Sequence, residues 1–129
     1  MEKYICTEPK PGDIIKVEIK NNIFHYGIYL GNDEVIQYGL AKDFLNTKKE
    51  DVEVLISSLD DFFNGKMALV RVYSFTEKLK KNKTNKIISL AKARLGEKKY
   101  DPINNNCEHF VNECVFNKHY SSQVENASK

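Results

Sequence analysis

The chain has 129 residues, 41% of them hydrophobic and 29% charged, and its 20 basic and 18 acidic residues give a formal net charge of +2. This length fits one domain that buries a core without disulfides or metal, and the composition excludes an intrinsically disordered chain. The balanced charge predicts no particular partner, and without a nucleic-acid-binding motif we do not expect nucleic acid to be one.

The N-terminal segment and the cysteines indicate the cellular compartment. Residues 1–13 lack the basic and then apolar regions of a secretory signal, and no stretch approaches the roughly 18 apolar residues that span a bilayer. Cys6, Cys107 and Cys114 form an odd set at spacings unlike a secreted disulfide framework. We therefore expect reduced thiols in a soluble, cytoplasmic protein whose contact with membranes, where it occurs, is peripheral.

The first half of the chain predicts three strands, and the domain is expected to begin near Gly12. Residues 13–20 alternate apolar and charged side chains, the period of a half-buried strand. Residues 23–31 are rich in β-branched and aromatic side chains, and residues 35–38 form a third short apolar run. Asn21-Asn22 provides a turn, so the three strands are expected to form an antiparallel meander.

The middle of the chain predicts a short helical turn, a strand and a longer helix. Residues 40–56 have no clear pattern, whereas residues 57–65 offer an N-cap serine and a closing glycine, and residues 67–73 resemble a strand. A run of lysines at 78–86 is typical of a solvated linker or helix start, and the alternative is a basic patch that contacts phosphates or an anionic membrane surface. An amphipathic helix then follows from Thr84 to Gly96, with a predicted core stripe of Ile87, Ile88, Ala91 and Leu95.

The last predicted helix, residues 107–116, carries the residues that point to chemistry. Its core face comprises Phe110, Val111, Cys114 and Val115, and the polar tail from Ser121 to Lys129 is expected to be frayed. Cys107 opens this helix, where backbone N–H groups and the helix dipole lower the pKa of a thiol. His25, in the middle of an apolar strand, is the candidate general base. A satisfied, buried histidine and an inert cysteine fit the same spacing, so the residues alone leave both interpretations open.

Three blocks of sequence resemble the lecithin:retinol acyltransferase (LRAT-like) family of the NlpC-type cysteine-hydrolase superfamily. They are Pro11-Gly-Asp-Ile-Ile15, His25-Tyr-Gly-Ile-Tyr-Leu-Gly31 and Asn106-Cys-Glu-His-Phe-Val-Asn112. The resemblance implies one catalytic domain over residues 1–129, with a core at about 11–117 and a polar tail at 121–129. It also implies an α+β, circularly permuted papain-like fold, with an antiparallel sheet packed against helices and the nucleophile at a helix N-terminus.

The resemblance implies a role for five residues. Cys107 would attack an acyl carbonyl and form a thioester, while His25 would deprotonate the thiol and later activate the acceptor. Family members commonly carry a second histidine twelve residues after the first, and this chain has Gln37 there. A glutamine can orient the imidazole but cannot support its positive charge as a carboxylate would. Tyr100 and His109 are expected to lie in the surrounding shell, Tyr100 also fitting a packing role.

No metal or cofactor is expected. Cys107, His109, Cys114 and His119 are possible ligands, but their spacing is poor for zinc because position 109 points away from the helix face shared by 107 and 114. Cys114 is expected in the core, and Cys6, outside the motifs, is expected to be incidental.

The sequence supports three functions. The first is a thiol-dependent acyltransferase or acyl hydrolase whose donor is a phospholipid or another lipid acyl ester. The second is a cysteine amidase or peptidase, which uses the same thioester step. The third, from a different class, is a catalytically idle binding module that retains the fold. The backbone N–H of Cys107 is the expected oxyanion donor, and the sequence identifies no second donor.

Overall fold

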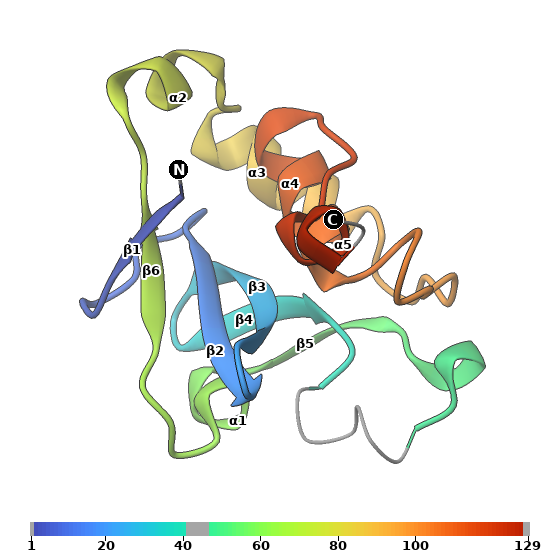
Figure 1. Ribbon diagram of the computed structural model, residues 1–129. Helices are drawn as coiled ribbons and strands as arrows, with labels where there is room; N and C mark the ends of the chain where they lie inside the picture. Colours follow the sequence, from blue (N-terminus) through green and yellow to red (C-terminus); the bar gives the residue numbers. More distant parts are fainter. Residues whose placement is uncertain (1, 41–46, 128–129) are drawn as a thin grey trace.

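The computed structural model describes residues 2–40 and 47–127, which form an α+β fold (Figure 1). Its sheet is antiparallel and has the strand order β1-β6-β2-β3-β4-β5. The strands are β1 (Lys3–Ile5), β2 (Ile14–Lys20), β3 (Ile23–Gly31), β4 (Glu34–Tyr38), β5 (Val54–Ser58) and β6 (Leu69–Val72). The α-helices are α1 (Leu59–Phe63), α2 (Phe75–Lys80), α3 (Thr84–Lys92), α4 (Cys107–Phe116) and α5 (Ser122–Ala127), and a 3₁₀ turn, η2, covers Lys49–Asp51.

Tight turns join the three central strands, as the sequence predicts. Asn21 and Asn22 have φ values of 34° and 67°, and Asn32 and Asp33 have 53° and 62°. Two consecutive residues with positive φ match the twist of an antiparallel hairpin, and Asn and Asp tolerate this region better than other side chains. These turns set the register that places residues of β2, β3 and β4 opposite one another.

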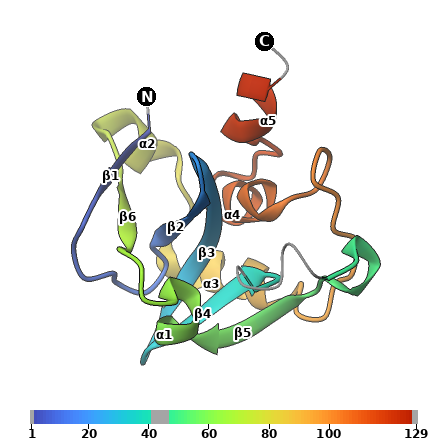
Figure 2. The same ribbon diagram turned by 60° about the horizontal axis from the view of Figure 1, so that its bottom comes forward.

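The two faces of the sheet are covered by different helices (Figures 1 and 2). On the face we call the α4 face, Ile14, Tyr26 and Ile28 pack with buried side chains of α3 and α4. The opposite face, called the α1 face, buries the second cluster of Ile15, Val17, Val35, Phe62 and Val70. Successive residues of a strand point to opposite faces, so neighbours such as Ile14 and Ile15 belong to different clusters.

The predicted strands and the two long helices are confirmed, with differences at their ends. The lysine run contributes to α2 and to the start of α3, whereas β1 and α5 lie in parts of the chain without a periodic pattern. β1 lies before the predicted domain start near Gly12 and adds a strand beside β6. Leu95, predicted in the core stripe, lies beyond the end of α3 and is 44% exposed, because that helix stops three residues earlier.

Gly27, in the middle of β3, is a point of very close packing. A Cβ atom there would lie 2.8 Å from Val35 Cγ1 and 2.9 Å from Phe62 Cε1. Phe62 in turn packs against the ring of His25, with the ring centroids 5.5 Å apart. The absence of a side chain at Gly27 therefore lets α1 approach the part of β3 that carries His25.

We predict that Gly27→Ala lowers the free energy of unfolding by about 1–3 kcal/mol, because the new methyl group overpacks a filled core. Urea unfolding followed by circular dichroism measures this change. Gly65→Asn is the matched control, since Gly65 has nothing within 4 Å of its Cβ position and a φ of 78° that asparagine tolerates. An equal loss in both variants would contradict this account of Gly27.

Candidate functional site

Cys107 is the first residue of α4, as predicted, and a reciprocal cap holds this helix end. The Oδ1 of Asn106 accepts the N–H groups of Glu108 and His109 at 2.9 and 3.0 Å. The Nδ1 of His109 accepts the N–H of Asn106 at 2.9 Å, completing a capping box in which histidine takes the usual place of Glu or Gln. His109 itself is buried. Burial also lowers its pKa, which favours the neutral ring that can accept a hydrogen bond.

The buried carboxylate of Glu108 ties the C-terminal segment to the same helix end. Its oxygens accept from the hydroxyl of Ser121 at 3.0 Å, the hydroxyl of Ser122 at 2.6 Å and the N–H of Gln123 at 3.3 Å. The Nδ2 of Asn106 donates to Ser121 Oγ at 3.2 Å. Residues 121–126 are thus held against α4, in contrast to the frayed tail that their polar composition predicts. A buried carboxylate needs such donors, and the segment supplies them.

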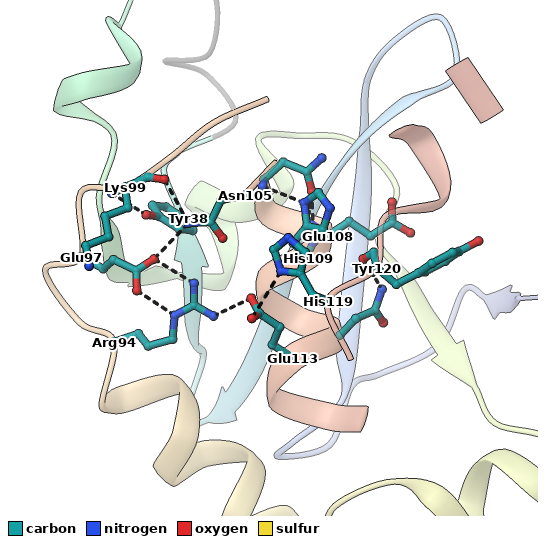
Figure 3. Close-up of polar contacts among 12 residues, drawn as sticks. Tyr38, Arg94, Glu97, Lys99, Asn105, Glu108, His109, Glu113, His119 and Tyr120 are labelled. Atoms are coloured by element: carbon teal, nitrogen blue, oxygen red, sulfur yellow. Dashed lines mark hydrogen bonds and ion pairs between the residues drawn. The ribbon is translucent and has the colours of Figure 1, made fainter. Parts of the chain in front are cut away.

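A second polar network fixes α4 relative to the end of α3 (Figure 3). The guanidinium of Arg94 contacts Glu97 at 2.8 Å and Glu113 of α4 at 3.0 Å. The ring of His119, 3.4 Å from Glu113, stacks on His109 with centroids 4.2 Å apart. This chain of contacts reaches from α3 to the residue that caps α4.

The thiol of Cys107 is buried, with the residue only 3% exposed. Burial raises the pKa of this thiol to about 12, although hydrogen bonding from the backbone N–H groups of Tyr26, Cys107 and Glu108 acts in the opposite direction. The helix N-terminus alone would lower the pKa, so the structure reverses the sign of the sequence-based expectation. At neutral pH the resting group is the thiol.

His25 and Gln37 are brought together on neighbouring strands. His25 Nε2 lies 2.7 Å from Gln37 Oε1, and both side chains are fully buried. The amide nitrogen of Gln37 donates to the hydroxyl of Ser57 on β5. Because this bond commits the amide nitrogen, the amide oxygen faces the imidazole, Nε2 carries the proton and Nδ1 carries the basic lone pair. Burial lowers the pKa of His25 to about 4, against the hydrogen bonds with Gln37 and the Gly39 backbone.

Cys107 contacts β3 next to His25, but the two side chains lie on different faces of the sheet. The His25 ring lies on the α1 face against Phe62, whereas Cys107 packs in the cluster of the α4 face. The thiol meets β3 at the backbone of Tyr26, the residue that follows His25. The pairing of β3 with β4 begins one residue later, at Gly27 and Gln37. The candidate nucleophile therefore lies where β3 emerges from its pairing with β4.

An apolar cavity of about 730 Å³ opens beside Cys107. The half-buried Tyr100 lies in its wall and packs edge-on against Tyr38, with centroids 5.3 Å apart. Burial, followed by the nearby Cys107, raises the pKa of Tyr100. The apolar residues that share this wall are Ile19, Ile23, Phe24, Val52, Ile103 and Val124. Such a cavity accepts a hydrocarbon chain or another apolar group next to the thiol.

Several residues of this site are not predicted by the sequence pattern. The pattern at residues 57–65 indicates only a helix start, and no pattern indicates a role for Glu108 or for the segment after Ser121. Asn106 directly before a helix-opening cysteine was a usable N-cap signal. The cavity wall combines residues from both ends of the chain, so no local pattern predicts it.

The part of the chain that the structure describes contains neither a cluster of metal ligands nor a membrane-spanning helix. Among residues 2–40 and 47–127, no three His, Cys, Asp or Glu side chains gather as a metal-ion site. In the same part of the chain, no helix has the length and apolar character needed to cross a bilayer. Cys114 is buried in the core and Cys6 is exposed.

The low pKa of His25 predicts acid sensitivity. Well above pH 6.5 the ring is neutral in both the folded and the unfolded protein. As the pH falls from 6.5 towards 4, the unfolded chain binds a proton at His25 that the folded protein does not bind. The free energy of unfolding should fall over this window by on the order of 3 kcal/mol. His25→Gln should show a clearly shallower loss when both proteins are unfolded in urea at pH 7.5, 5.5 and 4.5. Parallel curves would contradict a neutral, buried His25.

The histidine cap predicts a difference between two variants of one position. His109→Ala removes the acceptor for the Asn106 N–H and should lower the free energy of unfolding by about 0.5–2 kcal/mol. His109→Gln supplies an amide oxygen, as in an ordinary capping box, and should recover most of that loss. Thermal melts at neutral pH measure both. If the two variants lose equal stability, packing against His119 rather than capping explains the residue.

Comparison with known proteins shows which family the chain belongs to. The family model described as lecithin retinol acyltransferase matches residues 7–120. The chain is 30% identical to human "Phospholipase A and acyltransferase 4", an alignment covering 93% of the chain and 77% of that relative. It is 29% identical to mouse "Phospholipase A and acyltransferase 3", covering 95% and 80%. It is also 29% identical to mouse "Lecithin retinol acyltransferase", covering 88% of the chain but only 57% of that longer relative. The chain therefore belongs to the lecithin retinol acyltransferase family.

Proposed function

We propose that the protein is a thiol-dependent acyltransferase or acyl hydrolase that acts on a lipid acyl ester, with a phospholipid as the favoured donor. The observation that carries this proposal is the apolar cavity beside the Cys107 thiol at the start of α4. The names of the relatives, which combine phospholipase A and acyltransferase activities, support a lipid substrate. Ile23 and Ile103, 53% and 65% exposed at this cavity, suit peripheral contact with a lipid surface.

The proposed first half-reaction begins from a neutral pair. The proposal requires Nδ1 of His25 and the Cys107 thiol, which lie on different faces of β3, to meet where its pairing with β4 ends. There Nδ1 takes the proton of Cys107 while the sulfur attacks the ester carbonyl. The N–H groups of Cys107 and Glu108, at the helix end, are the proposed donors to the oxyanion. The imidazolium then gives its proton to the leaving alcohol oxygen as the C–O bond breaks, which leaves a thioester on Cys107.

The second half-reaction uses the same groups in reverse. His25 removes a proton from water or from another acceptor, whose oxygen or nitrogen attacks the thioester, and the released sulfur recovers a proton from the imidazolium. Gln37 positions the ring and its tautomer through the 2.7 Å contact with Nε2. Because Gln37 is neutral, it adds orientation without much charge stabilisation, and a slow enzyme is expected.

The proposal extends to the topology and the compartment. It includes a circularly permuted papain-like domain of the NlpC type in a cytoplasmic protein.

An amidase or peptidase would share the thioester step, but an apolar cavity suits an acyl chain better than a peptide. A binding module is the second candidate, because burial holds the Cys107 thiol in its protonated form and Gln37 replaces a histidine.

The decisive test is intact-protein mass spectrometry after incubation with a short-chain phosphatidylcholine. The expected result is a mass increase of one acyl group, absent in Cys107→Ala and at least about 100-fold slower in His25→Ala. Cys114→Ala removes the other buried thiol and is the matched control, which should still be acylated. No adduct with either a phospholipid or a short acyl amide would favour the binding module, and an adduct with the amide alone would favour the amidase.

The role of Gln37 predicts a second outcome. Gln37→Leu removes the acceptor for Nε2–H, frees the ring to change tautomer and should lower kcat by at least about tenfold with little change in KM. Gln37→His keeps a hydrogen-bonding ring and should retain or raise kcat. Steady-state hydrolysis of the short-chain phospholipid measures both. Equal kcat in all three proteins would remove Gln37 from the positioning role.

A further inference from the structure

A second cavity, of about 990 Å³, lies on the α4 face and is lined by charged, polar and aromatic residues. Its wall combines β2, β3 and β6 with α2, α4 and α5, elements that Figure 2 shows around the upper part of the sheet. Phe24 and Gln123 belong to the walls of both cavities. The N–H of Phe24 donates to Gln123 Oε1 at 2.9 Å. The apolar and the charged cavities are therefore neighbours on the two sides of one β3 residue.

Strand register directs two cations into this second cavity. Lys16 of β2 lies opposite Tyr26, and Arg71 of β6 lies opposite Tyr4, so the members of each pair share a face of the sheet. The ammonium of Lys16 lies 4.0 Å from the ring centroid of Tyr4 and 4.1 Å from that of Phe24. Arg71 is only 6% exposed.

These cations are incompletely neutralised. Arg71 contacts Glu77 at 2.6 Å and Glu2 at 4.0 Å, yet its Nε is buried without a hydrogen-bond partner among the described residues. In the described part of the chain, Lys16 has no carboxylate within ion-pair distance. The wall holds four basic side chains, Lys16, Arg71, Lys80 and Lys118, against the two carboxylates of Glu2 and Glu77. The buried Glu108 carboxylate also acts on Lys16, which leaves a surplus of one positive charge.

A half-buried ammonium without an ion-pair partner and a buried guanidinium with one unpaired N–H favour an anionic ligand. Removing charge from water costs free energy unless an opposite charge or hydrogen-bond acceptor replaces the water. Burial also lowers the pKa of Lys16 against the opposing carboxylates of Glu2 and Glu108, and a bound anion would act in the same direction as those carboxylates. A tetrahedral phosphate offers several acceptor oxygens to a guanidinium and an ammonium at once.

We propose that the second cavity binds a phosphate group through Lys16 and Arg71, and that this group is the phosphodiester of the acyl donor. The inference rests on the proposed function, because it places the acyl chain in the apolar cavity and the ester at Cys107. The Cys107 thiol meets the backbone of Tyr26, and the side chain of Tyr26 lines the charged cavity. A donor lying across Phe24 would reach both cavities, so the protein selects phospholipids over uncharged glycerides.

The test compares two short-chain ether lipids, which contain no ester to cleave. One is 1,2-di-O-hexylglycerophosphocholine and the other is 1,2-di-O-hexylglycerol, each titrated below its micelle concentration into the wild-type protein by calorimetry. We expect the phosphate-containing lipid to bind about tenfold or more tightly, the effect of a charge-assisted hydrogen bond. Equal affinities would overturn the proposal.

Variants at Lys16 test whether binding depends on this site or only on the overall positive charge of the protein. Lys16→Met should reduce the ratio of the two affinities about tenfold, and Lys16→Arg should restore it, with thermal melts reporting whether each variant folds. Lys92→Met removes a lysine exposed on α3 outside both cavities and should keep the wild-type ratio. An unchanged ratio in Lys16→Met, or an equal fall in Lys92→Met, would overturn the assignment.

Inorganic phosphate distinguishes the two sources of the ligand. Phosphate that weakens binding of the phosphate-containing ether lipid in the wild type, but not in Lys16→Met, supports the lipid phosphodiester. Phosphate that binds at Lys16 while the two ether lipids bind equally would overturn the lipid source and indicate a free-phosphate site. The ether-lipid titration measures binding and not turnover. A phosphate site that is wrong therefore shows in the titration, whereas a proposed acyl-enzyme that is wrong shows in the mass-spectrometry experiment.

Discussion

The reciprocal cap at the start of α4 is the interaction on which the rest of the site depends. Asn106 satisfies the first N–H groups of the helix, and His109 returns the contact, so the position of Cys107 is set by hydrogen bonds on both sides of it. The carboxylate of Glu108 instead accepts hydrogen bonds from Ser121 and Ser122 of the C-terminal segment. Asn106 and His109 therefore hold the helix end that carries the thiol, and Glu108 holds Gln123, which lines the apolar cavity together with Asn106.

Burial then determines the charge state of Cys107 and His25. It raises the pKa of Cys107 and lowers that of His25, so both are neutral at rest despite the helix end that faces the thiol. A papain-like ion pair is therefore not the resting state of this protein. In the proposed mechanism, proton transfer accompanies substrate binding, which restricts reactivity towards adventitious electrophiles and makes the electrostatics of the bound donor part of the proposed catalytic step.

The proposed function and the phosphate site both follow from the position of β3. This strand presents His25 to one face, meets Cys107 through its backbone and contributes Phe24 to the walls of two cavities of opposite character. An amphiphilic donor with an apolar chain and an anionic group matches this pair of cavities. The exposed apolar side chains beside the first cavity are consistent with a donor taken from a lipid surface.

Local pattern in the sequence was enough for the hairpin strands, the helix opened by Cys107 and, with the family resemblance, the pairing of His25 with Gln37. Those features depend on strand alternation, two-residue turns and helix caps, which involve residues close together in the chain. The sequence did not indicate that Ser121 and Gln123 return to α4, that β1 pairs with β6, or that Lys16 and Arg71 share a cavity. Nor did it indicate the raised pKa of Cys107. These properties arise where distant segments exclude water together, and burial of that kind exists only once the chain has folded.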